Sequence, residues 1–267
     1  MCHRLLGCLL PGCLLMTAAV VSAQATNPST AGDKHPNLNG VWNGGMGVRV
    51  LAQGDQQGLF LAAREGTLTN FERDNTIMRR MDPNRPIYKP EFWEKVQKLD
   101  QDGNNQDPSY GCLPLGVPRM GPPTKIVQTP EEIIFLYTGL QDTYRVISMD
   151  NRPHTPLADL DGTWKGEAVG HWEDDTLVVD TIGFNDTSWL DIGGYFHSEN
   201  MHVIERLHRD GDTLTWQATV DDPDVLIKPW TMNKRTLKRN PNPKAVLDET
   251  LPCSERDLSH LVTKEHH

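Results

Sequence analysis

The stretch 201–220, which reads MHVIERLHRDGDTLTWQATV, decides the fold. Its second half alternates apolar with polar side chains, which is the period of a β-strand that buries one face and exposes the other. The Asp-Gly-Asp turn at 210–212 is a tight connection, and tight connections join antiparallel neighbours. We therefore predict a β-hairpin with strands at 201–209 and 213–220.

The same design occurs upstream, where WEDDTL at 172–177 forms a second tight turn into an apolar strand. Short connections of this kind favour a mostly β domain, an antiparallel meander closed into a barrel, because closure removes exposed strand edges. GVW at 40–42 resembles the opening strand of lipocalin-like barrels, so a lipocalin-like barrel is the prediction and a β-sandwich the alternative. The further strands are predicted at 125–128, 132–137, 144–149, 167–172 and 176–182.

One short helix is predicted near residues 90–99. Proline in the first turn and two glutamates near the positive end favour its start. Its apolar face would consist of Phe92, Val96 and Leu99. The segment 107–123, with five prolines and three glycines, excludes a continuous helix or central strand, so an ordered loop is expected there.

The N-terminus has the pattern of a cleaved secretory signal. A basic start is followed by the apolar run 5–21 and a small-residue site at 22–25. The run is short for a membrane span and contains Pro11-Gly12, which favours a cleaved signal over a membrane anchor. No stretch of the mature chain is long and apolar enough for a span, so none is expected there. Cleavage after Ala25 is the prediction, and lipidation at Cys13 is the alternative. Residues 26–36 then form a disordered lead-in to a single β domain at 37–267.

Composition excludes one partner class and suggests one crosslink. The net charge is −10 with no lysine and arginine cluster, which excludes a nucleic-acid partner. After cleavage only Cys112 and Cys253 remain, and an even pair in an oxidising compartment predicts a disulfide between them. Two buried free thiols are the alternative.

The connector at 183–202 has the composition most typical of a functional segment. It is rich in histidine, aspartate, asparagine and aromatic residues, although its flanking strands could be joined by two residues. Its His197, Glu199 and His202 form the sequence His-x-Glu-x-x-His. Three interpretations stay open: an acid–base set, a metal site for zinc or non-haem iron, and structural polar residues. We predict that this connector forms a lid over the mouth of the barrel.

Asp180 interrupts the apolar strand at 177–182 and is either paired or functional. A structural partner would be Arg145 or Arg206. Arg119, on the proline-rich loop, is a candidate binder of an anion or carbonyl, with a structural ion pair as the alternative. The candidate substrate-binding residues are Asn185, Trp189, Arg119, Tyr144 and Phe184.

Three motifs, YKPEFW at 88–93, CLPLGVPRMGPP at 112–123 and GHWEDDTLVVDTIGFND at 170–186, resemble a family of secreted Gram-negative bacterial proteins usually described only as hypothetical. The likeness covers roughly 86–256 and implies an envelope location, but no activity. His171 and Lys165 depart from the family's pattern, which has arginine and methionine there.

We expect a periplasmic or secreted, cofactor-independent lyase, isomerase or hydratase that acts on a small apolar or aromatic molecule. The proton would move through His197 or His202, oriented by Glu199 or Asp180, and Asn185 with Arg119 would stabilise developing negative charge. The first alternative is a non-catalytic periplasmic binder of a hydrophobic ligand. The second is a metal-dependent hydrolase with a divalent metal such as zinc on His197, Glu199 and His202. The oligomeric state is not predicted.

Overall fold

The computed structural model describes residues 35–44, 84–101, 106–138, 142–191 and 193–250. The predicted signal at 1–25, most of the predicted lead-in and Cys253 lie outside these ranges, so the cleavage site and the disulfide stay predictions. His35, near the end of the predicted lead-in, stacks on Trp172 with ring centroids 4.8 Å apart. Within the described ranges, no helix is long and apolar enough to cross a membrane.

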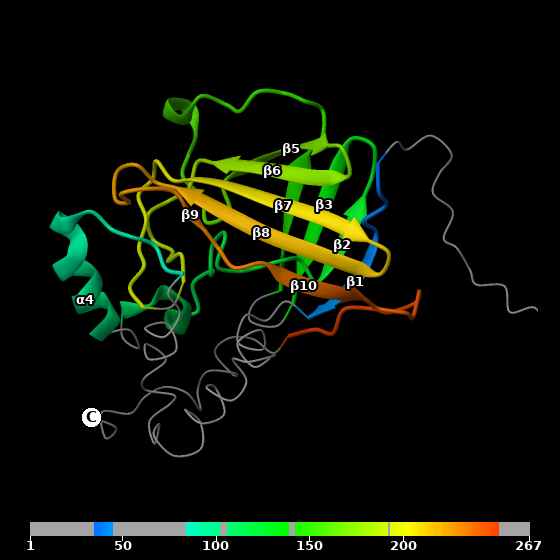
Figure 1. Cartoon of the computed structure of the whole chain (residues 1–267), viewed down its shortest axis with the longest axis horizontal. Coiled ribbons are helices and arrows are strands. Elements are labelled where there is room, and N and C mark those ends of the chain that lie inside the picture. The colour runs from blue at the N-terminus through cyan, green and yellow to red at the C-terminus, as the bar shows by residue number, and fades with distance from the viewer. Residues whose placement is uncertain (1–34, 45–83, 102–105, 139–141, 192, 251–267) are drawn as a thin grey trace, which may run out of the picture. The chain divides into compact units, whose positions relative to one another are not determined.

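Among the described residues, nine strands form a closed barrel (Figure 1), which confirms the predicted fold class. The ring closes because β10 pairs with both β1 and β8, so the sandwich alternative is wrong. A further strand, β9 at Trp230–Thr231, pairs with the end of β8. The barrel strands are β1 Gly40–Gly44, β2 Lys125–Gln128, β3 Glu132–Tyr137, β4 Thr143–Ser148, β5 Glu167–Glu173, β6 Thr176–Ile182, β7 His202–Asp210, β8 Thr213–Asp221 and β10 Arg235–Arg239.

The barrel departs from the predicted meander at one place. β4 and β5 run parallel and pair only at Ser148 and Val169, whereas the other neighbours are antiparallel. A parallel step needs a long crossover, and residues 149–166 provide it with the short 3-10 turn η4 at Leu157–Asp159. The barrel is therefore mixed rather than wholly antiparallel.

Side chains fill the barrel interior. Alternation along the strands turns Trp42, Phe135 and Trp216 inward, and all three are fully buried in one hydrophobic cluster. Burial of an aliphatic or aromatic side chain of this kind contributes roughly 1.5–3 kcal/mol. The open hollow that we expected in the barrel mouth is therefore occupied by the protein's own core.

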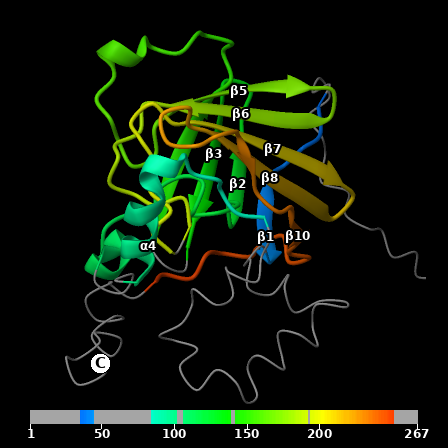
Figure 2. The same ribbon diagram turned by 60° about the vertical axis from the view of Figure 1, so that its left-hand side comes forward.

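The predicted helix forms at one end of the barrel (Figures 1 and 2). It begins as the 3-10 turn η2 at Pro90–Phe92 and continues as α4 at Trp93–Gln101. The predicted face of Phe92, Val96 and Leu99 packs against the core, as expected. Gly194 of the connector approaches α4 so closely that an added Cβ would lie 2.5 Å from Cβ of Leu99. The connector is thus held between α4 and the barrel.

The proline-rich loop is ordered, as predicted. It contains the 3-10 turn η3 at Pro108–Gly111. The N-cap residue of this turn, Asp107, accepts a hydrogen bond from the Ser109 backbone amide. The same carboxylate forms a buried bidentate ion pair with Arg119, at 2.8 and 2.6 Å. This pair ties the two ends of the loop together.

Candidate functional site

Asp180 lies near the middle of β6 on the outer face of the barrel. Its neighbour Thr181 is fully buried and faces the interior, so alternation turns Asp180 outward. In the register, Asp180 pairs with Val169 of β5 and Ile204 of β7. Residues two positions from these partners share the outer face with Asp180, which places His202 and Glu167 beside it.

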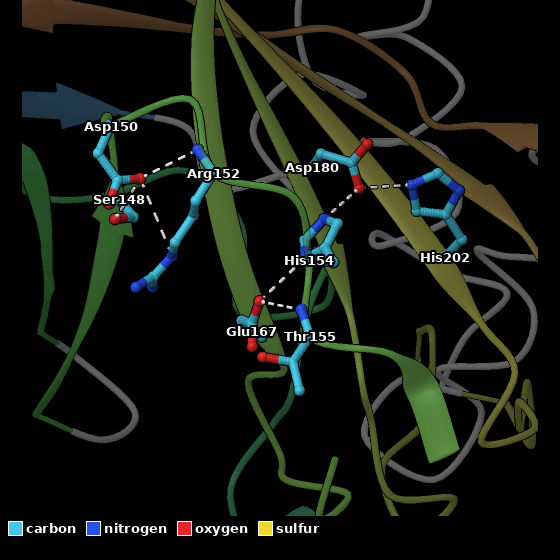
Figure 3. A network of polar contacts seen from close by, with 8 residues as sticks. All are labelled: Ser148, Asp150, Arg152, His154, Thr155, Glu167, Asp180 and His202. Atoms are coloured by element: carbon cyan, nitrogen blue, oxygen red, sulfur yellow. Dashed lines mark hydrogen bonds and ion pairs between the residues drawn. The ribbon is translucent and has the colours of Figure 1, made fainter. Parts of the chain in front are cut away.

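Two histidines share one oxygen of Asp180 (Figure 3). His202 Nε2 lies 2.6 Å from Asp180 Oδ1, and His154 Nε2 lies 3.0 Å from the same atom. His202 belongs to β7, whereas His154 comes from the crossover at 149–166. Asp180 and His202 were both predicted as site residues, and the structure brings them together. The sequence analysis missed His154, because it lies in a proline-bearing segment with no strand or helix periodicity.

The contact chain continues to Glu167 on β5. Its Oε1 atom lies 3.3 Å from His154 Nδ1 and accepts a hydrogen bond from the Thr155 backbone amide at 3.0 Å. The side chains of the four residues are 19–36% exposed, so the network is sheltered but reachable from solvent. We name the four residues His202, Asp180, His154 and Glu167 the outer-face network.

The protonation pattern follows from the acceptor. A carboxylate oxygen only accepts hydrogen bonds, so the Nε2 atoms of His202 and His154 carry the protons that face Asp180. Burial acts to raise the pKa of Asp180, but the hydrogen bonds and charges of His202 and His154 outweigh it and lower this pKa. In return, the hydrogen bond to Asp180 raises the pKa of His202 above its ordinary value of 6.5. The pair therefore favours an imidazolium beside a carboxylate.

This pair makes folding stability depend on pH. The raised pKa of His202 gives a contribution that is complete below pH 6.5 and is lost as the pH rises through the folded-state pKa. The lowered pKa of Asp180 gives one that is present above pH 3.8 and is lost as the pH falls through the folded-state pKa. The difference in free energy of unfolding between wild type and His202→Gln should therefore be largest between about pH 4 and 6.5, and below about 1 kcal/mol because the pair is partly exposed.

Urea unfolding of both proteins across this pH range measures the difference directly. The ion pair of His154 with Glu167 is present in both proteins and largely cancels. A difference that stays constant with pH, or that grows above pH 6.5, would contradict the assignment.

His197 lies apart from the outer-face network. It is buried, with Nε2 2.8 Å from Ser188 Oγ and Nδ1 3.0 Å from the Ser198 carbonyl oxygen. Burial lowers the pKa of His197, so the neutral ring donates from Nδ1 to the carbonyl and accepts from Ser188. Its catalytic assignment was made with Glu199, which is exposed. The structure does not bring His197, Glu199 and His202 together, and the described ranges hold no group of three His, Cys, Asp or Glu side chains arranged for a metal.

The predicted substrate-binding residues fall into different environments. Phe184 and Trp189 of the connector are buried in the core and are therefore not exposed to a substrate. Asn185 accepts a hydrogen bond from the Thr187 backbone amide in its own turn. Both terminal nitrogens of Arg119 contact Asp107. Tyr144 is exposed on the outer face of β4.

A buried ion pair crosses the barrel interior. Arg145 Nη1 lies 2.6 Å from Glu205 Oε2, and both side chains are almost fully buried. Arg145 also donates to Thr181, and the Trp216 indole donates to the other oxygen of Glu205 at 2.9 Å. Burial acts to lower the pKa of Arg145, but the charge of Glu205 and the hydroxyl of Tyr137 outweigh it and raise this pKa. Arg145 is therefore engaged inside the barrel and is not the partner of Asp180.

The chain was compared with protein-family models, curated proteins and solved structures. No protein-family model, curated protein or solved structure matches the chain.

Proposed function

We propose that this protein is an acid–base enzyme, a lyase, isomerase or hydratase that moves a proton on a small apolar or aromatic molecule. The observation that supports this most is the sharing of one Asp180 oxygen by His202 and His154, at 2.6 and 3.0 Å. A carboxylate that orients an imidazole and stabilises its charged form is a common arrangement for proton transfer. The outer-face network replaces the predicted set of His197 and Glu199 with His154 and Glu167.

His202 is the proton-exchanging group in this proposal. Its Nε2 proton is held by Asp180, its Nδ1 atom forms no hydrogen bond within the described ranges, and its side chain is 36% exposed. In its neutral form, Nδ1 of His202 accepts a proton from the substrate carbon, and the resulting imidazolium, which Asp180 stabilises, returns a proton to the product or to water. Asp180 positions the ring, and the carboxylate of Glu167 orients His154 behind it.

Deuterium exchange tests the whole reaction class without a known substrate. Lyases, isomerases and hydratases of this kind abstract a proton from carbon, so they wash solvent deuterium into a molecule that binds productively. We expect NMR in D₂O to detect exchange above the protein-free rate in a panel of mandelate, 2-phenylpropanoate and 3-methyl-2-oxobutanoate. His202→Gln should slow the exchange about a hundredfold, the lower end for a positioned acid–base group, because the site is only partly sheltered.

Two further variants separate catalysis from structure. Asp180→Asn should lower the exchange rate and shift the His202-dependent limb of the pH profile to lower pH, because it removes the charge that raises the pKa of His202. His208→Gln is the matched control, since His208 is an exposed histidine on the same strand with one long contact to Thr176. Absence of exchange across the panel, or equal loss in the His208 variant, would contradict the proposal.

Two alternative functions, binding of a hydrophobic ligand and metal-dependent hydrolysis, have less support from the structure. Binding of a hydrophobic ligand inside the barrel loses support because Trp42, Phe135 and Trp216 fill the interior. Metal-dependent hydrolysis through His197, Glu199 and His202 loses support because His197 is engaged with Ser188 and Ser198.

We further propose a periplasmic or secreted location. It is supported by the signal pattern at 1–25 and by the resemblance to secreted Gram-negative proteins in the motifs at 88–93, 112–123 and 170–186. The predicted disulfide between Cys112 and Cys253 belongs to the same proposal, because structural disulfides persist in oxidising compartments.

A further inference from the structure

A pocket opens between β4 and β5, beside the bridge that joins these two strands. The bridge is at Ser148 and Val169, so the β4 backbone before it has no strand partner on that side among the residues that the structure describes. The pocket is lined by Tyr144, Arg145, Val146, Lys165, Gly166 and Ala168. None of these residues belongs to the outer-face network.

The ammonium of Lys165 at this pocket has only neutral partners. Its Nζ atom donates to Thr143 Oγ1 at 3.1 Å and to the Tyr144 carbonyl oxygen at 2.8 Å. An ammonium has three protons, so one donor is left over. Within the described ranges, no carboxylate forms an ion pair with Lys165. Burial, followed by the charge of Arg145, lowers the pKa of Lys165.

Arg145, which also lines the pocket, carries an unsatisfied buried donor. The residue is 3% exposed, and its Nε atom has no hydrogen-bond partner in the described structure. Glu205 balances the charge of Arg145 one for one, which leaves the charge of Lys165 uncompensated. A buried donor without a partner and an unpaired ammonium both favour an anion.

The outer edge of the pocket is apolar. Tyr144 is 58% exposed and Val146 is 45% exposed, and both line the opening. Ala168, which also lines the pocket, is buried. Large exposed apolar side chains beside a cation suit a ligand that is charged at one end and apolar at the other.

We propose that the pocket binds a small monocarboxylate with an apolar or aromatic tail. The carboxylate contacts the free donor of Lys165, and the tail packs on Tyr144 and Val146. A phosphate dianion is less suited, because the pocket offers one accessible ammonium and an apolar edge rather than several convergent donors. The site stands whether or not the outer-face network is catalytic.

Calorimetric titration with benzoate as the probe tests the site. We expect the full chain to bind benzoate with a Kd of about 1 mM or tighter, and to bind the neutral analogue benzamide at least about tenfold more weakly. Lys165→Met keeps the length of the side chain but removes its charge, so it should weaken benzoate binding about tenfold or more. Lys228→Met, at an exposed lysine outside the pocket, is the matched control and should bind benzoate like the wild type.

Val146→Asp provides a second test at an exposed position that tolerates charge. A carboxylate at the pocket edge should repel benzoate, whereas Val146→Asn should weaken binding less. The proposal is overturned if about 10 mM benzoate gives no saturable heat with the wild type, or if Lys165→Met binds benzoate with unchanged affinity. Because the readout is binding, failure here leaves the exchange experiment on His202 unaffected, and the reverse also holds.

Discussion

Glu205→Gln is expected to lower the free energy of unfolding by about 3–5 kcal/mol, because it leaves the charge of Arg145 buried without a counter-ion. Both side chains of the pair are almost fully buried, at 2% and 1% exposure. Glutamine keeps an oxygen for the Trp216 indole, so the loss reports the charge rather than that hydrogen bond. Chemical unfolding of both proteins at one pH measures the effect, with a fall in Tm of several degrees as the parallel readout.

The outer face of the barrel offers a matched control for this variant. Arg206 and Glu173 are joined at 2.6 Å, the same distance as Arg145 and Glu205, but their side chains are 47% and 49% exposed. Glu173→Gln should therefore cost much less stability than Glu205→Gln. Combining Glu205→Gln with Arg145→Met removes both buried charges and should restore most of the lost stability. Equal losses for the buried and exposed glutamates would show that burial of the pair does not control its contribution.

The barrel strands were predictable where the chain repeats a simple pattern. The turns at 173–176 and 210–213 and the alternation in β8 follow directly from the residues, and the predicted bounds of β2, β3 and β6 are those observed. The closing strand β10 was missed because, of its five residues Arg235–Arg239, only Leu237 is apolar. Its alternation is therefore too weak to distinguish a strand from a charged loop. Closure depends on pairing partners distant in sequence, which local periodicity does not reveal.

The candidate site was predictable only where strands carry its residues. Asp180 and His202 lie on neighbouring antiparallel strands, so their outward positions and closeness follow from the register. His154 reaches the same oxygen from an irregular crossover, and no pattern within 149–166 indicates where that segment folds. The grouping of His197 with His202 rested on nearness along the chain, and the structure gives the two rings different hydrogen-bond partners. The connector directs His197 inward to Ser188, while His202 begins the next strand.

The buried pair of Arg145 and Glu205 could also have been predicted from the sequence. Glu205 occupies an inward position of β7 between Val203 and Leu207, where alternation calls for an apolar side chain. Arg145 occupies the corresponding inward position of β4, two residues before Ile147. Two opposite charges at inward positions of different strands predict a buried pair once a barrel is assumed, because an isolated buried charge is too costly.

Asp107→Asn is expected to lower the free energy of unfolding by about 3 kcal/mol or more, because Arg119 would lose the only carboxylate that it contacts in the described structure. The Asp107 side chain is fully buried and also accepts hydrogen bonds from the amide and hydroxyl of Ser109. Asparagine keeps one acceptor for Ser109 but turns donors toward the guanidinium. Urea unfolding gives the size of the loss, and limited proteolysis should show earlier cleavage within 107–123.

Variants at the other end of the pair decide between a structural and a binding role for Arg119. Arg119→Lys replaces the two parallel hydrogen bonds to Asp107 with a single ammonium charge. It should therefore lower the free energy of unfolding, but by less than Asp107→Asn does. The exposed pair of Asp150 and Arg152, 3.9 Å apart, supplies the control Asp150→Asn, which should change stability by less than about 1 kcal/mol. If Arg119 only holds the loop, Arg119→Lys destabilises the fold but leaves benzoate affinity and deuterium exchange unchanged. A stable Arg119→Lys protein that loses benzoate binding or deuterium exchange would instead place the guanidinium in contact with the ligand. If the loop stays folded, a residue with a purely structural role cannot change either measurement.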